Sequence, residues 1–109
     1  MDYITAKAGE RIFYIEKERI EAIVMRPEIW RVPEAPEEIL GIAVYGHKLV
    51  AYRDFGTGHE VPCGILLRDG EGGLHGFAAQ AVEEEELSAE EAEAAEPCAF
   101  SGVWEKSSD

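Results

Sequence analysis

Residues 39–54 read Ile39-Leu-Gly-Ile-Ala-Val-Tyr-Gly-His-Lys-Leu-Val-Ala-Tyr-Arg-Asp54. Two apolar runs flank a turn at Gly46, a pattern that predicts a β-hairpin with strands at 39–44 and 49–52. Three prolines punctuate residues 27–36 just upstream. Because proline fixes its own φ and pushes the preceding residue towards extended geometry, no long helix can precede the hairpin. This stretch therefore predicts β structure with a stiff, extended entry.

Short apolar runs bounded by turn residues recur along the rest of the chain. They predict further strands at residues 3–6, 11–15, 20–24, 63–67, 74–82 and 99–104. The polar residues 16–19 fit one helical turn. Gly76, inside the strand predicted at 74–82, indicates a bulge or a close backbone approach. Many short strands separated by turns are typical of an all-β barrel or sandwich.

The C-terminal quarter differs in composition from the remainder. Four consecutive glutamates occupy residues 83–86, which we interpret as a solvated charge run. Ser88 and Glu91 then fit a capping box, which predicts a short helix near residues 89–96 that Pro97 ends. The fold class expected from the residues is therefore mainly β with one short helix.

Length, charge and cysteine content restrict the function classes. A chain of 109 residues is about one domain long, so we expect a single domain over residues 1–109 with an acidic C-terminal segment at 83–109. The formal net charge is −13, and residues 83–109 hold ten acidic side chains against one basic. Such a balance opposes binding to nucleic acid or to anionic membrane surfaces.

Neither membrane insertion nor a disulfide framework is expected. No stretch approaches the roughly 20 apolar residues that span a bilayer, and no signal-peptide pattern is seen. Cys63 and Cys98 lack the short spacing of a zinc knuckle. We therefore expect a cytoplasmic protein whose thiols are reduced.

No set of residues with catalytic spacing is present, so an enzyme is not expected. A metal or small-molecule site built from His47, His59, His75 and Cys63 is one alternative, although these residues share no ligand-type spacing. Scattered histidines and a buried structural thiol at Cys63 are the preferred interpretation. Trp30 and Trp104 are expected to pack in the core.

Several runs occur in an order and spacing that resemble the CheW-like family, the coupling proteins of bacterial chemotaxis arrays. They are Phe13-Tyr-Ile15, Arg19-Ile-Glu-Ala-Ile23, Trp30-Arg-Val-Pro-Glu-Ala-Pro36, Ile39-Leu-Gly-Ile42, Leu49-Val-Ala-Tyr-Arg-Asp-Phe-Gly56 and Gly76-Phe-Ala-Ala-Gln-Ala-Val82. The chain resembles a short and diverged member. The resemblance implies two small SH3-like five-stranded β-barrels that share a core.

Some positions depart from the family pattern. The family's hairpin tip, Asn-x-Arg-Gly, carries an arginine linked to partner binding, whereas this chain has Val44-Tyr-Gly-His47. Ala51 replaces a proline of the family's strand, and Gln80 replaces a late aspartate. Only five residues follow Trp104, where family members continue through a strand that closes the first barrel.

The resemblance implies a non-catalytic adaptor in chemotaxis or two-component signalling. Its expected partners are a CheA-like histidine kinase and the cytoplasmic domains of chemoreceptors, with no cofactor and no metal. The predicted contact face on the hairpin comprises Ile42, Val44, Tyr45, His47, Val50 and Tyr52. Ile20 and Ile23 are expected to line the groove between the barrels. Self-association through an unclosed sheet edge is a further alternative.

Overall fold

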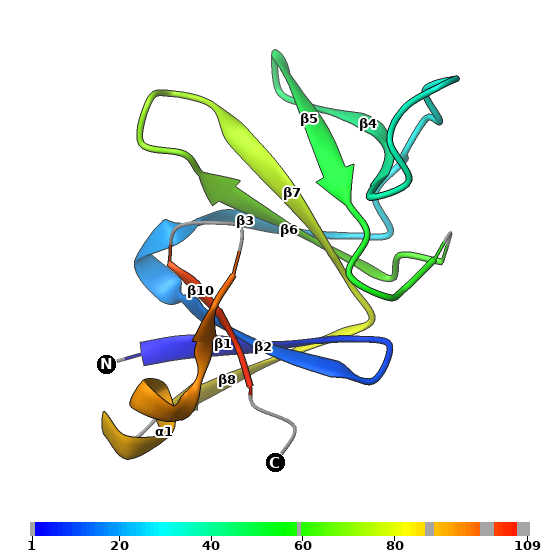
Figure 1. The fold of residues 1–109 in the computed structure, drawn as a ribbon. Coiled ribbons are helices and arrows are strands. Elements are labelled where there is room, and N and C mark those ends of the chain that lie inside the picture. Colours follow the sequence, from blue (N-terminus) through cyan, green and yellow to red (C-terminus); the bar gives the residue numbers. More distant parts are fainter. Residues whose placement is uncertain (1, 59, 87–88, 99–101, 107–109) are drawn as a thin grey trace.

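The computed structural model describes residues 2–58, 60–86, 89–98 and 102–106. Its elements, in chain order (Figure 1), are β1 Asp2–Ala8, β2 Arg11–Glu16, the 3-10 turn η1 Lys17–Arg19, β3 Ile20–Met25, β4 Ile39–Tyr45, β5 Lys48–Arg53, β6 Cys63–Arg68, β7 Leu74–Ala79, β8 Ala81–Glu86, α1 Ala89–Ala94, β9 Glu96–Pro97 and β10 Val103–Glu105. The predicted fold class, mainly β with one short helix, is confirmed.

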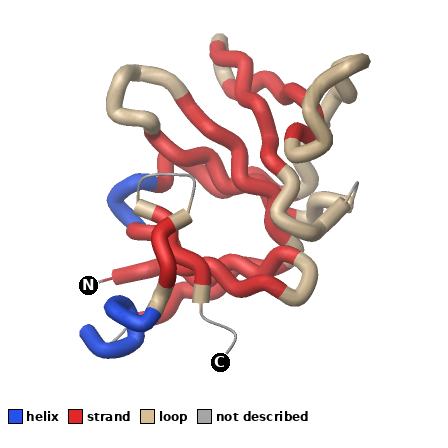
Figure 2. Tube along the Cα trace, in the orientation of Figure 1, coloured by secondary structure: helices blue, strands red, loops and turns tan. Residues whose placement is uncertain are grey.

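The strands form two sheets, which lie one above the other in Figure 2. Sheet A has the order β8-β1-β2-β10-β9, and sheet B has the order β3-β6-β7-β5-β4. All neighbours pair antiparallel except β5 and β7, which are parallel. Sheet A is therefore assembled from both ends of the described chain, and sheet B from its middle.

The predicted hairpin of β4 and β5 is present, with each strand one residue longer at the tip. Tyr45 lies opposite Lys48, and Gly46 adopts a φ of 62° between them. A positive φ of this size is adopted by glycine without the steric cost that a Cβ atom brings. The glycine is thus what allows so tight a connection.

The single strand predicted at 74–82 is wrong, because the chain changes sheets within it. It leaves sheet B after β7, bends at Gln80, and enters sheet A as β8 beside β1. The Gln80 N–H donates to the Lys7 carbonyl over 2.7 Å, and the Gly9 N–H donates to Gln80 Oε1 over 2.9 Å. The acidic run 83–86 is consequently part of a paired strand. The sequence pattern along residues 74–82 does not show at which residue the chain passes from one sheet to the other.

The C-terminal elements differ from prediction in their bounds. Helix α1 ends at Ala94, before the predicted residue 96, and Glu96–Pro97 form the short strand β9. Proline disfavours helical backbone at the residue before it, which explains the earlier end. Ser88 and residues 99–101 lie outside the described residues, while Val103–Glu105 pair with β2 as strand β10. No helix among the described residues is long and apolar enough to cross a membrane.

Three phenylalanine rings join the two sheets. Phe77 of β7 stacks on Phe55 at 4.4 Å between ring centroids, and both meet Phe13 of β2 edge to face at 5.0 and 5.1 Å. The same core cluster contains Cys63, which is 4% exposed and confirms the predicted structural thiol. This cluster holds sheet B against sheet A.

A second cluster lies within sheet B around Tyr52. The Tyr52 ring packs directly on Gly76 of β7, the strand next to β5, and on Gly64 of β6, one strand further across the sheet. The sequence predicted a bulge or a close backbone approach at Gly76. The register of β6 with β7 runs through Gly76 without a bulge, and what lies close to it is a side chain, the Tyr52 ring.

An ion pair ties β10 to β2. Arg11 donates two hydrogen bonds to the Glu105 carboxylate, at 2.9 and 2.7 Å, and its guanidinium lies 4.9 Å from the Phe13 ring centroid. The hydrogen bond from Arg11 holds the pKa of Glu105 below its usual value. Both side chains are partly exposed, so we expect a stabilisation below about 1 kcal/mol.

This pair gives a prediction on pH dependence. A carboxylate whose pKa is depressed by folding stabilises the protein above the unfolded pKa, and this stabilisation is lost as the pH falls through the folded pKa. The free energy of unfolding of Glu105→Gln should therefore be lower than that of the unmodified protein at pH 7. The difference should vanish in acid. Urea unfolding at several pH values measures it, and a constant difference would contradict the assignment.

Candidate partner-binding surface

The β4–β5 hairpin presents two faces with different surroundings. Side chains alternate along a strand, and directly opposed residues share a face. Ala43 lies opposite Val50, and both are buried. Val44 lies opposite Leu49, and these are 54% and 70% exposed. The predicted hairpin residues therefore divide between an inner and an outer face.

The outer face carries an exposed apolar surface, which we call the hairpin patch and define as Trp30, Ile42, Val44 and Leu49. Trp30 joins it through an isolated bridge to Ile42, in which each backbone N–H donates to the other's carbonyl over 2.8 Å. The Trp30 side chain is 59% exposed, so its predicted place in the core is wrong. Trp104 is half-buried and packs edge to face with Tyr3 at 6.0 Å.

Glycine at position 41 permits this crossing. A Cβ atom there would come within 2.8 Å of Ile29 Cγ2 and would also collide with the Trp30 backbone. Real Cβ atoms do not approach other atoms this closely, so only glycine lets the segment carrying Trp30 lie against β4. The position of the exposed tryptophan thus depends on Gly41.

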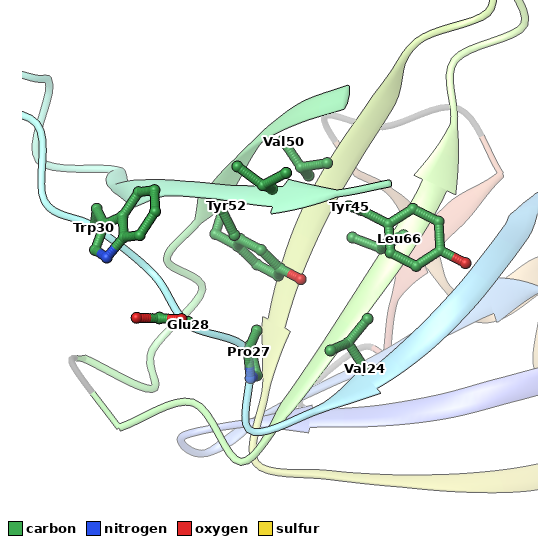
Figure 3. Close-up of a pocket in the computed structure, with 10 residues that line it drawn as sticks. Val24, Pro27, Glu28, Trp30, Tyr45, Val50, Tyr52 and Leu66 are labelled. Atoms are coloured by element: carbon green, nitrogen blue, oxygen red, sulfur yellow. The ribbon is translucent and has the colours of Figure 1, made fainter. Parts of the chain in front are cut away.

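The inner face of the hairpin borders a cleft of about 110 Å³, which we call the β3–β4 cleft (Figure 3). It lies between β3 and β4, which are the edge strands of sheet B. Its lining residues are Val24, Pro27, Glu28, Trp30, Ala43, Val44, Tyr45, Val50, Tyr52 and Leu66. The buried members of this set form an apolar floor, and the exposed members form the rim.

Val50 and Tyr52, both predicted as contact residues, lie in the core. They are 0% and 1% exposed and point inward from β5, whereas their neighbour Leu49 points outward. Burial raises the pKa of the Tyr52 hydroxyl to about 12. A partner can reach these two side chains only through the β3–β4 cleft.

The remaining predicted contact residues do not form one continuous surface. His47 is exposed at the hairpin tip. Ile20 is half-buried against the cluster between the sheets, and Ile23 is 38% exposed. The bulge between them puts both on one face of β3, because they lie opposite Leu67 and Ile65, which belong to the same core cluster. That they line one groove stays a prediction.

Four large, exposed apolar residues of the described part of the chain were missed from the sequence: Leu49, Trp30, Val32 and Met25. Alternation places Leu49 and Val50 on opposite faces of the strand, but it does not say which of the two points outward. The exposure of Trp30 could not have been predicted, since it depends on how the proline-containing segment crosses β4. Met25 is 66% exposed at the end of β3, opposite Cys63 of β6.

The alternative metal site receives no support from the geometry. Among the described residues, no group of three or more His, Cys, Asp or Glu side chains could hold a metal ion. His47 is exposed in the turn between β4 and β5, and His75 is exposed on β7. Cys63 is buried between the sheets. His59 lies outside the described residues.

Comparison with known proteins agrees with the architecture. No known protein family and no curated protein match the chain in sequence. Among solved structures, the crystal structure of scaffolding protein TtCheW from Thermoanaerobacter tengcongensis superposes with a TM-score of 0.69 at 21% sequence identity. The fold is CheW-like. The match covers 83% of this chain and 64% of TtCheW, so this chain spans less than two thirds of that protein.

Proposed function

We propose that this protein is a non-catalytic, cytoplasmic adaptor of bacterial chemotaxis. In this role it couples a CheA-type histidine kinase to the cytoplasmic domains of chemoreceptors through protein–protein contacts. The observation that carries the proposal is the hairpin patch, an exposed apolar surface on a CheW-like fold. Exposed apolar patches rimmed by polar residues are typical of interaction sites.

The composition of the hairpin patch suits a binding role. Tryptophan is enriched among the residues that contribute most to interface affinity. Trp30 lines the β3–β4 cleft together with the exposed Val44, which lies opposite the exposed Leu49. Residues 39–53 contain no acidic side chain, although the whole chain has a net charge of −13. The two hairpin strands therefore offer a partner a locally non-acidic area, with Glu28 at its border where Trp30 and Val44 line the β3–β4 cleft.

The missing arginine of the family's hairpin tip changes how the tip would bind. Here Gly46 and His47 occupy the tip, so no guanidinium is available there for paired hydrogen bonds to a carboxylate. We propose that apolar contacts from Val44 and Leu49 supply the affinity in its place. Coupling through this surface should consequently depend weakly on salt.

Titration of ¹⁵N-labelled protein with the regulatory fragment of a CheA-type kinase tests the proposal. We expect amide shifts concentrated on β4, β5 and Trp30. Leu49→Asp should weaken binding at least tenfold, because a partner would have to bury an unpaired carboxylate. Ala81→Asp, an equally charged change at an exposed position of β8, is the matched control and should bind normally.

Two results would contradict this function. One is the absence of any shift with kinase or receptor fragments at high concentration. The other is a mass that doubles with concentration in light scattering and returns to that of a monomer in Leu49→Asp. That second result would assign the hairpin patch to self-association.

A further inference from the structure

The β3–β4 cleft has the dimensions of a site for one side chain. Its volume of about 110 Å³ is well below the roughly 300 Å³ at which pockets for drug-sized ligands begin. Valine, leucine and tyrosine carbons line its floor. A single aliphatic side chain of a partner could bury its surface there without moving either edge strand.

The hydroxyl of Tyr52 gives this floor a directional polar group. Figure 3 shows the hydroxyl pointing into the space between Val24, Pro27 and Tyr45. The Tyr52 side chain is 1% exposed, and among the described residues its oxygen has no hydrogen-bond partner. Because no fully buried side-chain oxygen or nitrogen lacks a partner in the described part of the chain, this hydroxyl is accessible from the cleft, where it can donate to an entering acceptor. With a pKa near 12, the hydroxyl keeps its proton at neutral pH and can donate.

The charge at the rim restricts the occupant further. Glu28 is the charged residue among the described lining residues, and it forms no ion pair in the described part of the chain. A lysine or arginine next to the inserted side chain would meet this carboxylate. The cleft therefore combines an apolar floor, one hydrogen-bond donor and one anion.

We infer that the β3–β4 cleft binds an extended, basic peptide segment of a partner protein. One leucine-sized side chain enters the cleft, a main-chain carbonyl of the segment accepts a hydrogen bond from Tyr52 Oη, and an adjacent lysine or arginine pairs with Glu28. The inference rests on the proposed adaptor role, since it takes the occupant to be a protein. A second copy of this chain fits poorly, because each copy carries a net charge of −13.

The test uses short synthetic peptides and the ¹⁵N-labelled full chain. One peptide has Lys-Leu-Lys at its centre, a second has Glu-Leu-Glu, and a third has Lys-Ser-Lys. We expect only the first to shift the amides of Val24 and of Ala43 to Tyr45. Tyr52→Phe keeps the ring against its two glycines and removes only the hydroxyl, so it should weaken that binding about fivefold.

Glu28→Gln provides a second, independent variant at an exposed position. It should reduce the preference for Lys-Leu-Lys over Glu-Leu-Glu by about threefold, because the nearest anion is gone while the net negative charge of the rest of the chain still favours the basic peptide. Equal affinity of the two peptides for the unmodified protein would overturn the inference. So would unchanged binding of Lys-Leu-Lys to Tyr52→Phe.

The kinase fragment separates this inference from the proposed function. If the fragment binds the unmodified protein and Tyr52→Phe equally, and no peptide shifts the cleft amides, the peptide site is wrong and the adaptor role stands. If Lys-Leu-Lys binds in the cleft but neither kinase nor receptor fragments bind, the peptide site stands and the adaptor role is wrong.

Discussion

Replacing Phe77 with alanine is expected to destabilise the protein by about 3–5 kcal/mol, the usual cost of deleting a buried aromatic ring. The Phe77 side chain is fully buried, and it contacts both Phe55 in the same half of the molecule and Phe13 of sheet A. Since the free energy of unfolding of small domains is only about 5–15 kcal/mol, this one substitution would remove a large part of it.

Urea unfolding followed by tryptophan fluorescence measures the effect of Phe77→Ala. Leu49→Ala is the matched control, because it deletes an apolar side chain that is 70% exposed. It should change the free energy of unfolding by no more than about 0.5 kcal/mol. Similar losses for the two variants would show that the phenylalanine cluster does not hold the sheets together.

Gly76→Ala is expected to destabilise the protein by about 1–3 kcal/mol, the typical cost of overpacking a core. A Cβ atom at this position would lie 2.7 Å from Cγ and Cδ1 of Tyr52. Without that collision the change would be favourable, because alanine loses less conformational freedom than glycine when a strand forms. A measured gain in stability would therefore contradict the packing of Tyr52 described above.

A double-mutant cycle isolates this contact. Tyr52→Ala removes the ring and should itself be costly. In that background Gly76→Ala should cost much less than it does alone, since the added methyl group enters the space that the ring has left. Additive effects would mean that the alanine methyl group is accommodated elsewhere.

The sequence predicted most of the strands because their signals are local. Residues 39–54 combine β-branched and aromatic residues with a glycine turn, and both strands of that hairpin are found where expected. Gly76 was singled out as the site of a bulge or a close backbone approach, whereas the structure shows the Tyr52 ring packed against it. These features depend on neighbours in sequence or on one buried contact.

Features that depend on distant partners were not predictable. The bend at Gln80 is stabilised by the carbonyl of Lys7 and the N–H of Gly9, which are more than seventy positions away along the chain. Trp30 is exposed because the segment that carries it crosses β4 at Gly41. The inward orientation of Val50 and Tyr52 followed from the register of β5, which the hydrophobicity of the residues alone does not set.

The division of the predicted contact face has a consequence for mutagenesis. Changes at Val50 or Tyr52 act on stability as well as on binding, because both side chains are in the core. Changes at Val44 or Leu49 act at the surface. Loss of binding by an outer-face variant is therefore the cleaner evidence for a partner surface.

The way the sheets are threaded affects how the chain can fold during synthesis. Strands β3 to β7 form a continuous segment, so all five strands of sheet B are available once residue 79 has left the ribosome. The hairpin of β1 and β2 is made first, yet its neighbours β8 and β10 are translated last. Until then both edges of this early hairpin lack their partner strands, and unpaired strand edges are prone to pair with other chains.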